Sequence, residues 1–77
     1  MKGENANMGN LEALIGRKIK LRLEQIGITQ KELAIRADLT EAAISRYISG
    51  QRIPNLANAK RIADALYVGL EWLVNDK

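Results

Sequence analysis

Hydrophobic residues recur at helical spacing along most of the chain, and no stretch alternates as a half-buried strand would. From residue 11 to residue 26 they stand three or four positions apart, at Leu11, Leu14, Ile15, Ile19, Leu23 and Ile26. This spacing predicts an amphipathic helix that ends at Gly27, because glycine readily takes the left-handed conformation of a helix C-terminus. The polar residues 1–9, which include two glycines, predict a flexible N-terminal arm.

Two short helices are predicted next, joined by a tight turn. The segment 29–32 has the form of a capping box, in which the Thr29 hydroxyl accepts from the Glu32 amide and the Glu32 side chain reaches back. Thr40 is a good N-cap for the following helix, and Asp38 tolerates the left-handed geometry of a turn. The apolar positions are Leu33, Ala34 and Ala37 on the first of these helices, and Ile44, Tyr47 and Ile48 on the second.

Two more helices complete the prediction. Gly50 ends the third helix, Pro54 prevents its continuation, and Asn55 is suited to cap a fourth. The fourth helix carries Leu56, Ala59, Ile62, Ala63 and Leu66, and a short fifth carries Leu70, Trp72, Leu73 and Val74. We therefore predict an all-α protein with one compact five-helix domain over residues 10–77.

Composition narrows the function classes. A chain of 77 residues suffices for one modest core, and it contains neither cysteine nor histidine. Disulfides and thiolate metal sites are thereby excluded, as are the commonest general base and the commonest metal ligand. No base partners the serines, and no glycine-rich phosphate loop follows a strand. We expect no enzyme activity, no cofactor, no metal and no small-molecule ligand.

Charge and hydropathy give weaker indications of the binding partner and of the location of the protein than the composition gives of its function class. The formal net charge is +3, which is compatible with nucleic acid but does not demonstrate it. The N-terminus is polar and unlike a signal peptide, and no apolar run approaches the length of a membrane span. We expect a cytoplasmic protein that does not bind a membrane.

The second and third helices together form the informative feature. A short helix, a tight turn and an immediately following helix, with the small Ala34 at the crossing point, predict a helix-turn-helix. The order of segments 28–34, 39–40, 44–50 and Pro54, followed by segment 62–73, resembles the Cro and phage-repressor type of helix-turn-helix family, the Xre-like regulators. The resemblance extends from about Ile15 to Val74. It departs from the family at Leu23, Asp38 and Tyr67, where arginine, glycine and glycine are usual.

The resemblance implies a lambda-repressor-like fold and sequence-specific binding of double-stranded DNA, by a bacterial or phage-encoded protein associated with the nucleoid when bound. The third helix would read base edges in the major groove with Glu41, Ala42 and Arg46, flanked by Thr40 and Ser45. Arginine, glutamate and alanine suit guanine, cytosine and the thymine methyl, respectively. Glu41 has a second interpretation, which is stabilisation of the helix dipole, and the two can coexist.

Further contacts are implied at the periphery of this helix. By resemblance, Gln30 binds a phosphate together with the exposed amides of its helix N-terminus. The other phosphate candidates are Arg17, Lys20, Arg22, Ser49 and Arg52. For each arginine or lysine, the alternative is an ordinary solvated side chain. Tyr47 is expected to be half-buried, with its hydroxyl near the DNA backbone.

Members of this family often pair through their C-terminal end, which implies a homodimer on a near-palindromic operator and, most commonly, repression of transcription. The candidate interface residues are Tyr67, Leu70, Trp72, Leu73 and Val74, although Trp72 is also expected in the core. The alternative function is a protein-interaction module or an antitoxin-type partner-binding protein. Such a groove would show regularly spaced apolar anchors, whereas the outer face of the third helix is polar.

Overall fold

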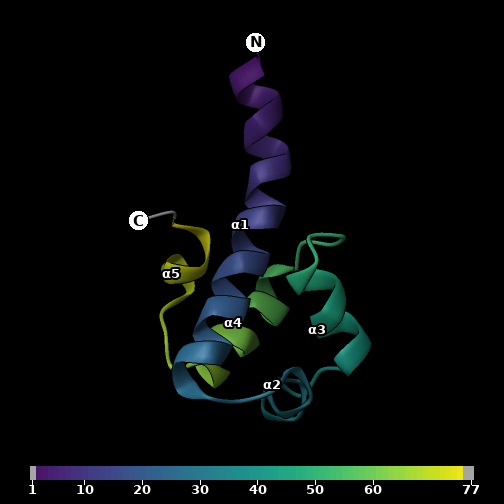
Figure 1. Ribbon diagram of the computed structural model, residues 1–77, viewed down its shortest axis with the longest axis vertical. Helices are drawn as coiled ribbons and strands as arrows, with labels where there is room; N and C mark the ends of the chain where they lie inside the picture. The colour runs from purple at the N-terminus through teal and green to yellow at the C-terminus, as the bar shows by residue number, and fades with distance from the viewer. Residues whose placement is uncertain (1, 76–77) are drawn as a thin grey trace.

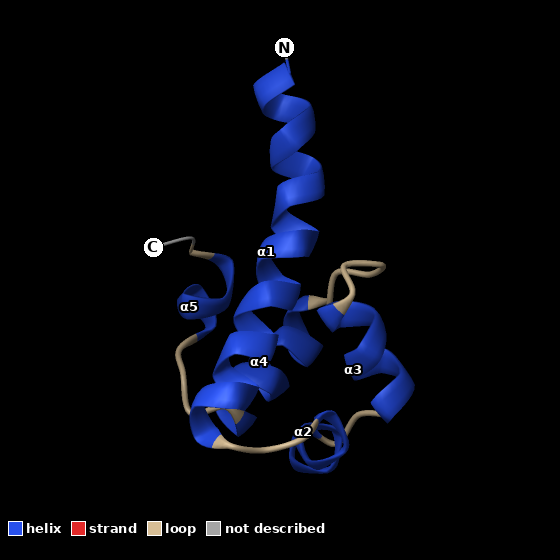
Figure 2. Cartoon of the chain, viewed as in Figure 1, coloured by secondary structure: helices blue, strands red, loops and turns tan. Residues whose placement is uncertain are grey.

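The computed structural model describes residues 2–75, with the backbone alone for residues 2–10, and over this range it contains helices and no strand (Figures 1 and 2). The helices are α1 (Lys2–Ile26), α2 (Gln30–Ala37), α3 (Glu41–Ile48), α4 (Leu56–Ala65) and α5 (Leu70–Val74). The predicted all-α, five-helix fold is confirmed, with the helix order that the hydrophobic pattern indicated.

The three predicted N-caps are all formed. In each case an extended residue accepts a hydrogen bond from the amide three positions ahead, which satisfies one of the free N–H groups at the helix start. The bonds are Thr29 Oγ1 with the Glu32 amide at 3.1 Å, Thr40 Oγ1 with the Ala43 amide at 3.0 Å, and Asn55 Oδ1 with the Asn58 amide at 2.8 Å. The second half of the capping box differs from the prediction, because the Glu32 carboxylate accepts from Arg36 instead.

The turn between α2 and α3 uses a non-glycine residue in the left-handed region, as predicted. Asp38 has φ 58° and ψ 46°, and its amide donates to the carbonyls of Ala34 and Ile35. The Leu39 amide also donates to the Ala34 carbonyl, at 2.9 Å. These bonds satisfy the last carbonyls of α2 and reverse the chain so that α3 follows at once.

The first helix begins earlier than its hydrophobic pattern predicted. The pattern starts at Leu11, whereas α1 is helical from Lys2, and Figure 1 shows its N-terminal part projecting beyond the other helices. Hydrophobic periodicity detects only the buried turns of a helix, while the backbone hydrogen bonds continue through polar residues. The division into an arm at 1–9 and a domain at 10–77 stays a prediction.

The core draws on every helix. α3 packs against α1 and α2, α2 packs against α4, and α5 packs against α1 and α4. The largest fully buried side chains are Ile19, Leu33, Ile44, Ile62, Leu66 and Leu73. Each such aliphatic side chain contributes about 1.5–3 kcal/mol by leaving water. Burial therefore fixes the rotation of α3, whose opposite face is left to the solvent.

Candidate DNA-binding interface

The outer face of α3 is polar and exposed. Burial of Ile44 and Tyr47 turns the helix so that the predicted base-contacting positions point to solvent. The exposed residues are Thr40, Glu41, Ala42, Ser45, Arg46 and Ser49. The helix is eight residues long, from Glu41 to Ile48, and its outer face carries one acidic and one basic side chain. Its dimensions suit the major groove of B-DNA, which admits an α-helix.

The ends of α3 are held by local hydrogen bonds. Thr40 caps the N-terminus, while the Ser49 hydroxyl donates to the Arg46 carbonyl at 3.1 Å. Arg52 follows in the exposed connector, and its amide approaches the same carbonyl at 3.4 Å. The side chains of Arg46 and Arg52 are exposed on and just beyond the helix. Two guanidinium groups thus lie at the C-terminal end of the candidate reading helix.

Gln30 is the first residue of α2 and is exposed. The Glu32 amide donates to the Thr29 hydroxyl, so the earlier amides of the first turn remain available to an anion. A helix N-terminus of this kind favours phosphate through its amides and its dipole. The position predicted for Gln30 as a phosphate contact is therefore compatible with the structure.

The three cationic candidates on α1 differ in their surroundings. Arg17 and Lys20 are exposed. Lys20 lies one helical turn after Gly16, the residue of α1 that packs against α3. Arg22 is partly buried, and its Nε donates to the Leu66 carbonyl at 2.9 Å. Its Nη1 also donates to Gln25 Oε1 at 3.1 Å. Arg22 therefore joins α1 to the end of α4, a role that its place in the sequence did not reveal.

The predicted half-burial of Tyr47 was wrong, whereas the place of its hydroxyl near the DNA backbone stays a prediction. Its side chain is only 7% exposed, and its hydroxyl accepts from Asn58 Nδ2 at 3.0 Å. The ring belongs to the core and the hydroxyl links α3 to α4. Periodicity placed Tyr47 on the inner face correctly, but it could not reveal a polar partner on another helix.

The predicted dimer residues divide into two groups. Leu73 is fully buried inside the protein, so its side chain belongs to the core and cannot form part of a surface patch. Leu70 and Trp72 are half-buried, and the Trp72 ring lies 4.0 Å from Lys18 Nζ, a cation–π contact between α1 and α5. Tyr67 and Val74 are 72% and 48% exposed. Only part of the predicted patch is therefore accessible.

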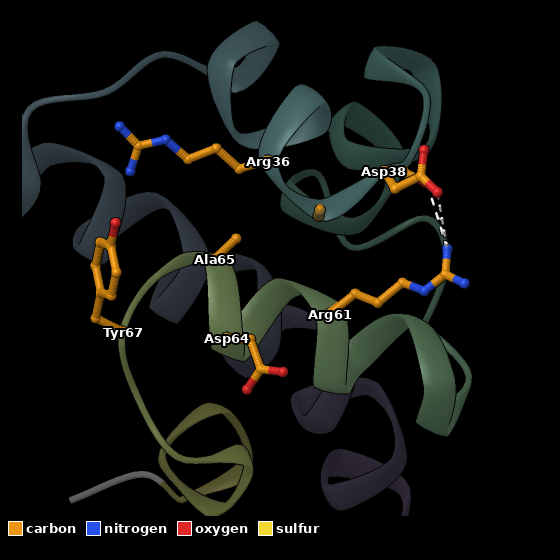
Figure 3. A pocket seen from close by; sticks show the side chains of 7 residues that line it. Arg36, Asp38, Arg61, Asp64, Ala65 and Tyr67 are labelled. Carbon is orange, nitrogen blue, oxygen red and sulfur yellow. Dashed lines mark hydrogen bonds and ion pairs between the residues drawn. The ribbon is translucent and has the colours of Figure 1, made fainter.

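Tyr67 also borders an open groove of about 790 Å³ between α2 and α4. Figure 3 shows Arg36 and Arg61 on opposite sides of it, and the Arg61 guanidinium approaches Asp38 Oδ2 at 3.9 Å. Arg36 pairs with Glu32, and Asp64 pairs with Lys60 at 2.8 Å. The charges around the groove are thus largely compensated by neighbouring side chains.

Two other findings bear on the class of site. No group of three or more metal-ligating side chains occurs within the described residues. Likewise, none of the helices between residues 2 and 75 combines the length and hydropathy needed to cross a membrane.

Two short helices joined by a tight turn, the second with an exposed polar face, define a helix-turn-helix protein. The profile of the Helix-turn-helix family matches residues 19–73. The chain belongs to this family, of the Cro and phage-repressor type that its sequence resembles. Its general function is accordingly DNA binding in the regulation of transcription.

The fold is also similar to a solved structure, that of the restriction-modification controller protein C.AhdI from Aeromonas hydrophila. The TM-score is 0.78 with 24% sequence identity, and the match covers 80% of this chain and 94% of that chain. At this identity the likeness demonstrates the shared fold. The chain matches no curated protein sequence.

Proposed function

We propose that this protein is a sequence-specific transcriptional repressor that inserts α3 into the major groove of double-stranded DNA. The observation that carries the proposal is the exposed polar face of α3, held in place by the burial of Ile44 and Tyr47 on the opposite face. Arg46 can bind guanine O6 and N7 with two hydrogen bonds, Glu41 can accept from cytosine N4, and the Ala42 methyl can pack on a thymine methyl.

Phosphate contacts surround this reading helix in the proposal. Gln30 and the amides at the start of α2 bind one phosphate, and the exposed Arg52, Lys20 and Arg17 supply attraction that weakens with salt. Ser49 lies at the C-terminal end of α3, where its hydroxyl donates to the Arg46 carbonyl and holds the end of the helix. Arg22 is left out because its guanidinium is engaged with the Leu66 carbonyl.

The working unit is a homodimer on a near-palindromic operator. The exposed Tyr67 and Val74, with the half-buried Leu70 and Trp72, provide apolar surface around α5 for a two-fold contact. Such a dimer would present two copies of α3 to major grooves about 34 Å apart. The protein acts in the cytoplasm by occupying DNA near a promoter, and it catalyses no reaction. A regulatory role agrees with the description of the similar structure as a controller protein.

The test is selection of binding sites from random duplex DNA by the wild type and by Arg46→Ala. We expect a two-fold symmetric motif for the wild type, and loss of preference at one position in each half-site for the variant. One good base contact is worth about 1–3 kcal/mol of discrimination. Arg36→Ala removes an exposed arginine from α2 and is the matched control, which should select the wild-type motif.

Two outcomes would contradict the proposal in different ways. If no motif is enriched and all binding is lost uniformly with rising salt, the protein binds DNA through charge alone. If a motif is enriched but Arg46→Ala selects the same motif as the wild type, specific binding stands and the assignment of α3 residues to bases fails.

A further inference from the structure

One glycine lies in the middle of α1, where alanine would be more favourable for the helix. Gly16 is buried, and it stands where α1 packs against the C-terminal end of α3. A Cβ atom at this position would lie 2.8 Å from the Tyr47 carbonyl oxygen and 3.0 Å from the Ile48 carbonyl carbon, with the Ile48 oxygen closer still. The backbones of the two helices are therefore in direct contact at this point.

The atoms that oppose Gly16 cannot move independently. They are backbone carbonyls of the last turn of α3, so any atom added at Gly16 must displace the helix itself rather than rotate a side chain. Non-bonded contacts between heavy atoms are comfortable at about 3.5–4.0 Å, so the two backbones would have to separate by on the order of 1 Å. The glycine hydrogen that replaces Cβ points at these carbonyls, a C–H···O arrangement common where helices pack closely.

Two further attachments hold α3. Tyr47, whose carbonyl faces Gly16, also accepts from Asn58 of α4 through its hydroxyl, and the Asp38 turn fixes the N-terminal end. Displacement at Gly16 would consequently move the C-terminal end of α3 and tilt the helix about its N-terminal end rather than release it. Its outer face carries Arg46, which lies in the same last turn as Tyr47 and Ile48.

We propose that Gly16 is a positioning residue for DNA recognition, which sets how α3 sits on α1 and hence which base edges its side chains reach. This inference rests on the proposed function of α3. Hydrogen bonds to bases tolerate only a few tenths of an ångström in distance, so a shift on the order of 1 Å is enough to lose a paired contact. Salt-dependent phosphate contacts of flexible lysines and arginines are less demanding.

Gly16→Ala tests the proposal, with Gly27→Ala as the matched control. Gly27 has φ +78° and no atom within 4 Å of a Cβ position, so alanine there strains the backbone without moving α3. Two quantities are measured for each folded variant: the ratio of operator affinity to affinity for unrelated duplex, and the backbone amide NMR shifts without DNA. We expect Gly16→Ala to lower the ratio by about tenfold or more while keeping its affinity for unrelated duplex.

In the free protein, Gly16→Ala should shift the amides along Glu41–Ile48, whereas Gly27→Ala should affect only its surroundings and leave the ratio unchanged. Equal ratios for Gly16→Ala and the wild type would overturn the proposal, and so would a reduction of the same size in Gly27→Ala. If Gly16→Ala is unfolded in buffer, the comparison is repeated in trimethylamine N-oxide, which favours compact states. Failure to fold even there would make Gly16 a requirement for folding and would also overturn the proposal.

The amide shifts separate this inference from the proposed function. If the wild type shows no operator preference while Gly16→Ala still shifts the amides of α3, the assignment of specific recognition fails and the seating of α3 by Gly16 stands. If the wild type is specific and the α3 amides are unmoved, the inference about Gly16 fails by itself.

Discussion

Tyr67 has a backbone conformation that suits glycine rather than tyrosine. Its φ is +61°, in the left-handed region, and its ring is 72% exposed. A bulky residue held there costs of order 1–3 kcal/mol, and so exposed a ring recovers little of that cost through packing. The strain falls in the connection between α4 and α5, at one of the residues predicted to form the dimer.

We predict that Tyr67→Gly stabilises the protein by about 1 kcal/mol, because relief of the strain outweighs the greater flexibility of glycine in the unfolded chain. Urea unfolding monitored by circular dichroism measures the change. Tyr67→Ala is the control, since it removes the ring but keeps Cβ, and it should bring little or no gain. An equal gain in both variants would show that the ring, and not the backbone, is the source of the strain.

Individual side chains were predictable where the determining interaction is local. Thr29, Thr40 and Asn55 cap helices through amides three positions away, so their roles are visible in the sequence. The exposure of Tyr47 was overestimated, because its hydroxyl partner lies on another helix. Gly16 was overlooked for the same reason, since nothing in its local sequence indicates carbonyls of α3 beside it.

At the scale of whole helices, two cationic side chains of α1 contact the C-terminal half of the protein. Arg22 donates to the Leu66 carbonyl at the end of α4, and Lys18 lies over the Trp72 ring of α5. Hydrophobic periodicity predicted the helices and their inner faces, because burial is what creates the pattern. It gave no means of telling a phosphate-binding cation from one that joins two helices, and Arg22 was grouped with Arg17 and Lys20 accordingly.

We predict that Arg22→Met lowers the free energy of unfolding by about 1 kcal/mol, because the Leu66 carbonyl loses a donor. It should leave unchanged the slope of log affinity against log salt concentration for DNA binding. Lys20→Met, which removes an exposed cation from the same helix, should do the reverse, with stability nearly unchanged and the slope reduced by about 1 for each bound half-site. Urea unfolding and salt titrations of an operator duplex provide the two measurements.

The opposite pattern is equally informative. If Arg22→Met reduces the salt slope and leaves stability unchanged, the phosphate contact predicted for Arg22 is correct, and the bond to Leu66 is exchanged for one to DNA.

For the whole molecule, the arrangement of exposed apolar residues determines how two copies could pair. Val74 is the last residue of α5 and Tyr67 lies shortly before this helix, whereas Ile35 lies on α2 and is 71% exposed. Two-fold pairing brings the same patch of both copies together, so a residue near the axis meets its own counterpart. The sequence supplied the candidate end of the molecule but not which side chains remain accessible, since Leu73 proved to be core.

We predict that Val74→Asp weakens the proposed dimer at least about tenfold, because two carboxylates would be brought into an apolar contact around the axis. Sedimentation equilibrium measures the dimer dissociation constant, and titration with full operator and with a single half-site shows whether pairing or base reading is affected. Half-site affinity should stay at the wild-type value while operator affinity falls. Ile35→Asp is the control, as it places the same charge on an equally apolar but distant position of α2. A dimer that survives Val74→Asp and dissociates with Ile35→Asp would move the interface to α2 and would place the two α3 helices in a different geometry on DNA.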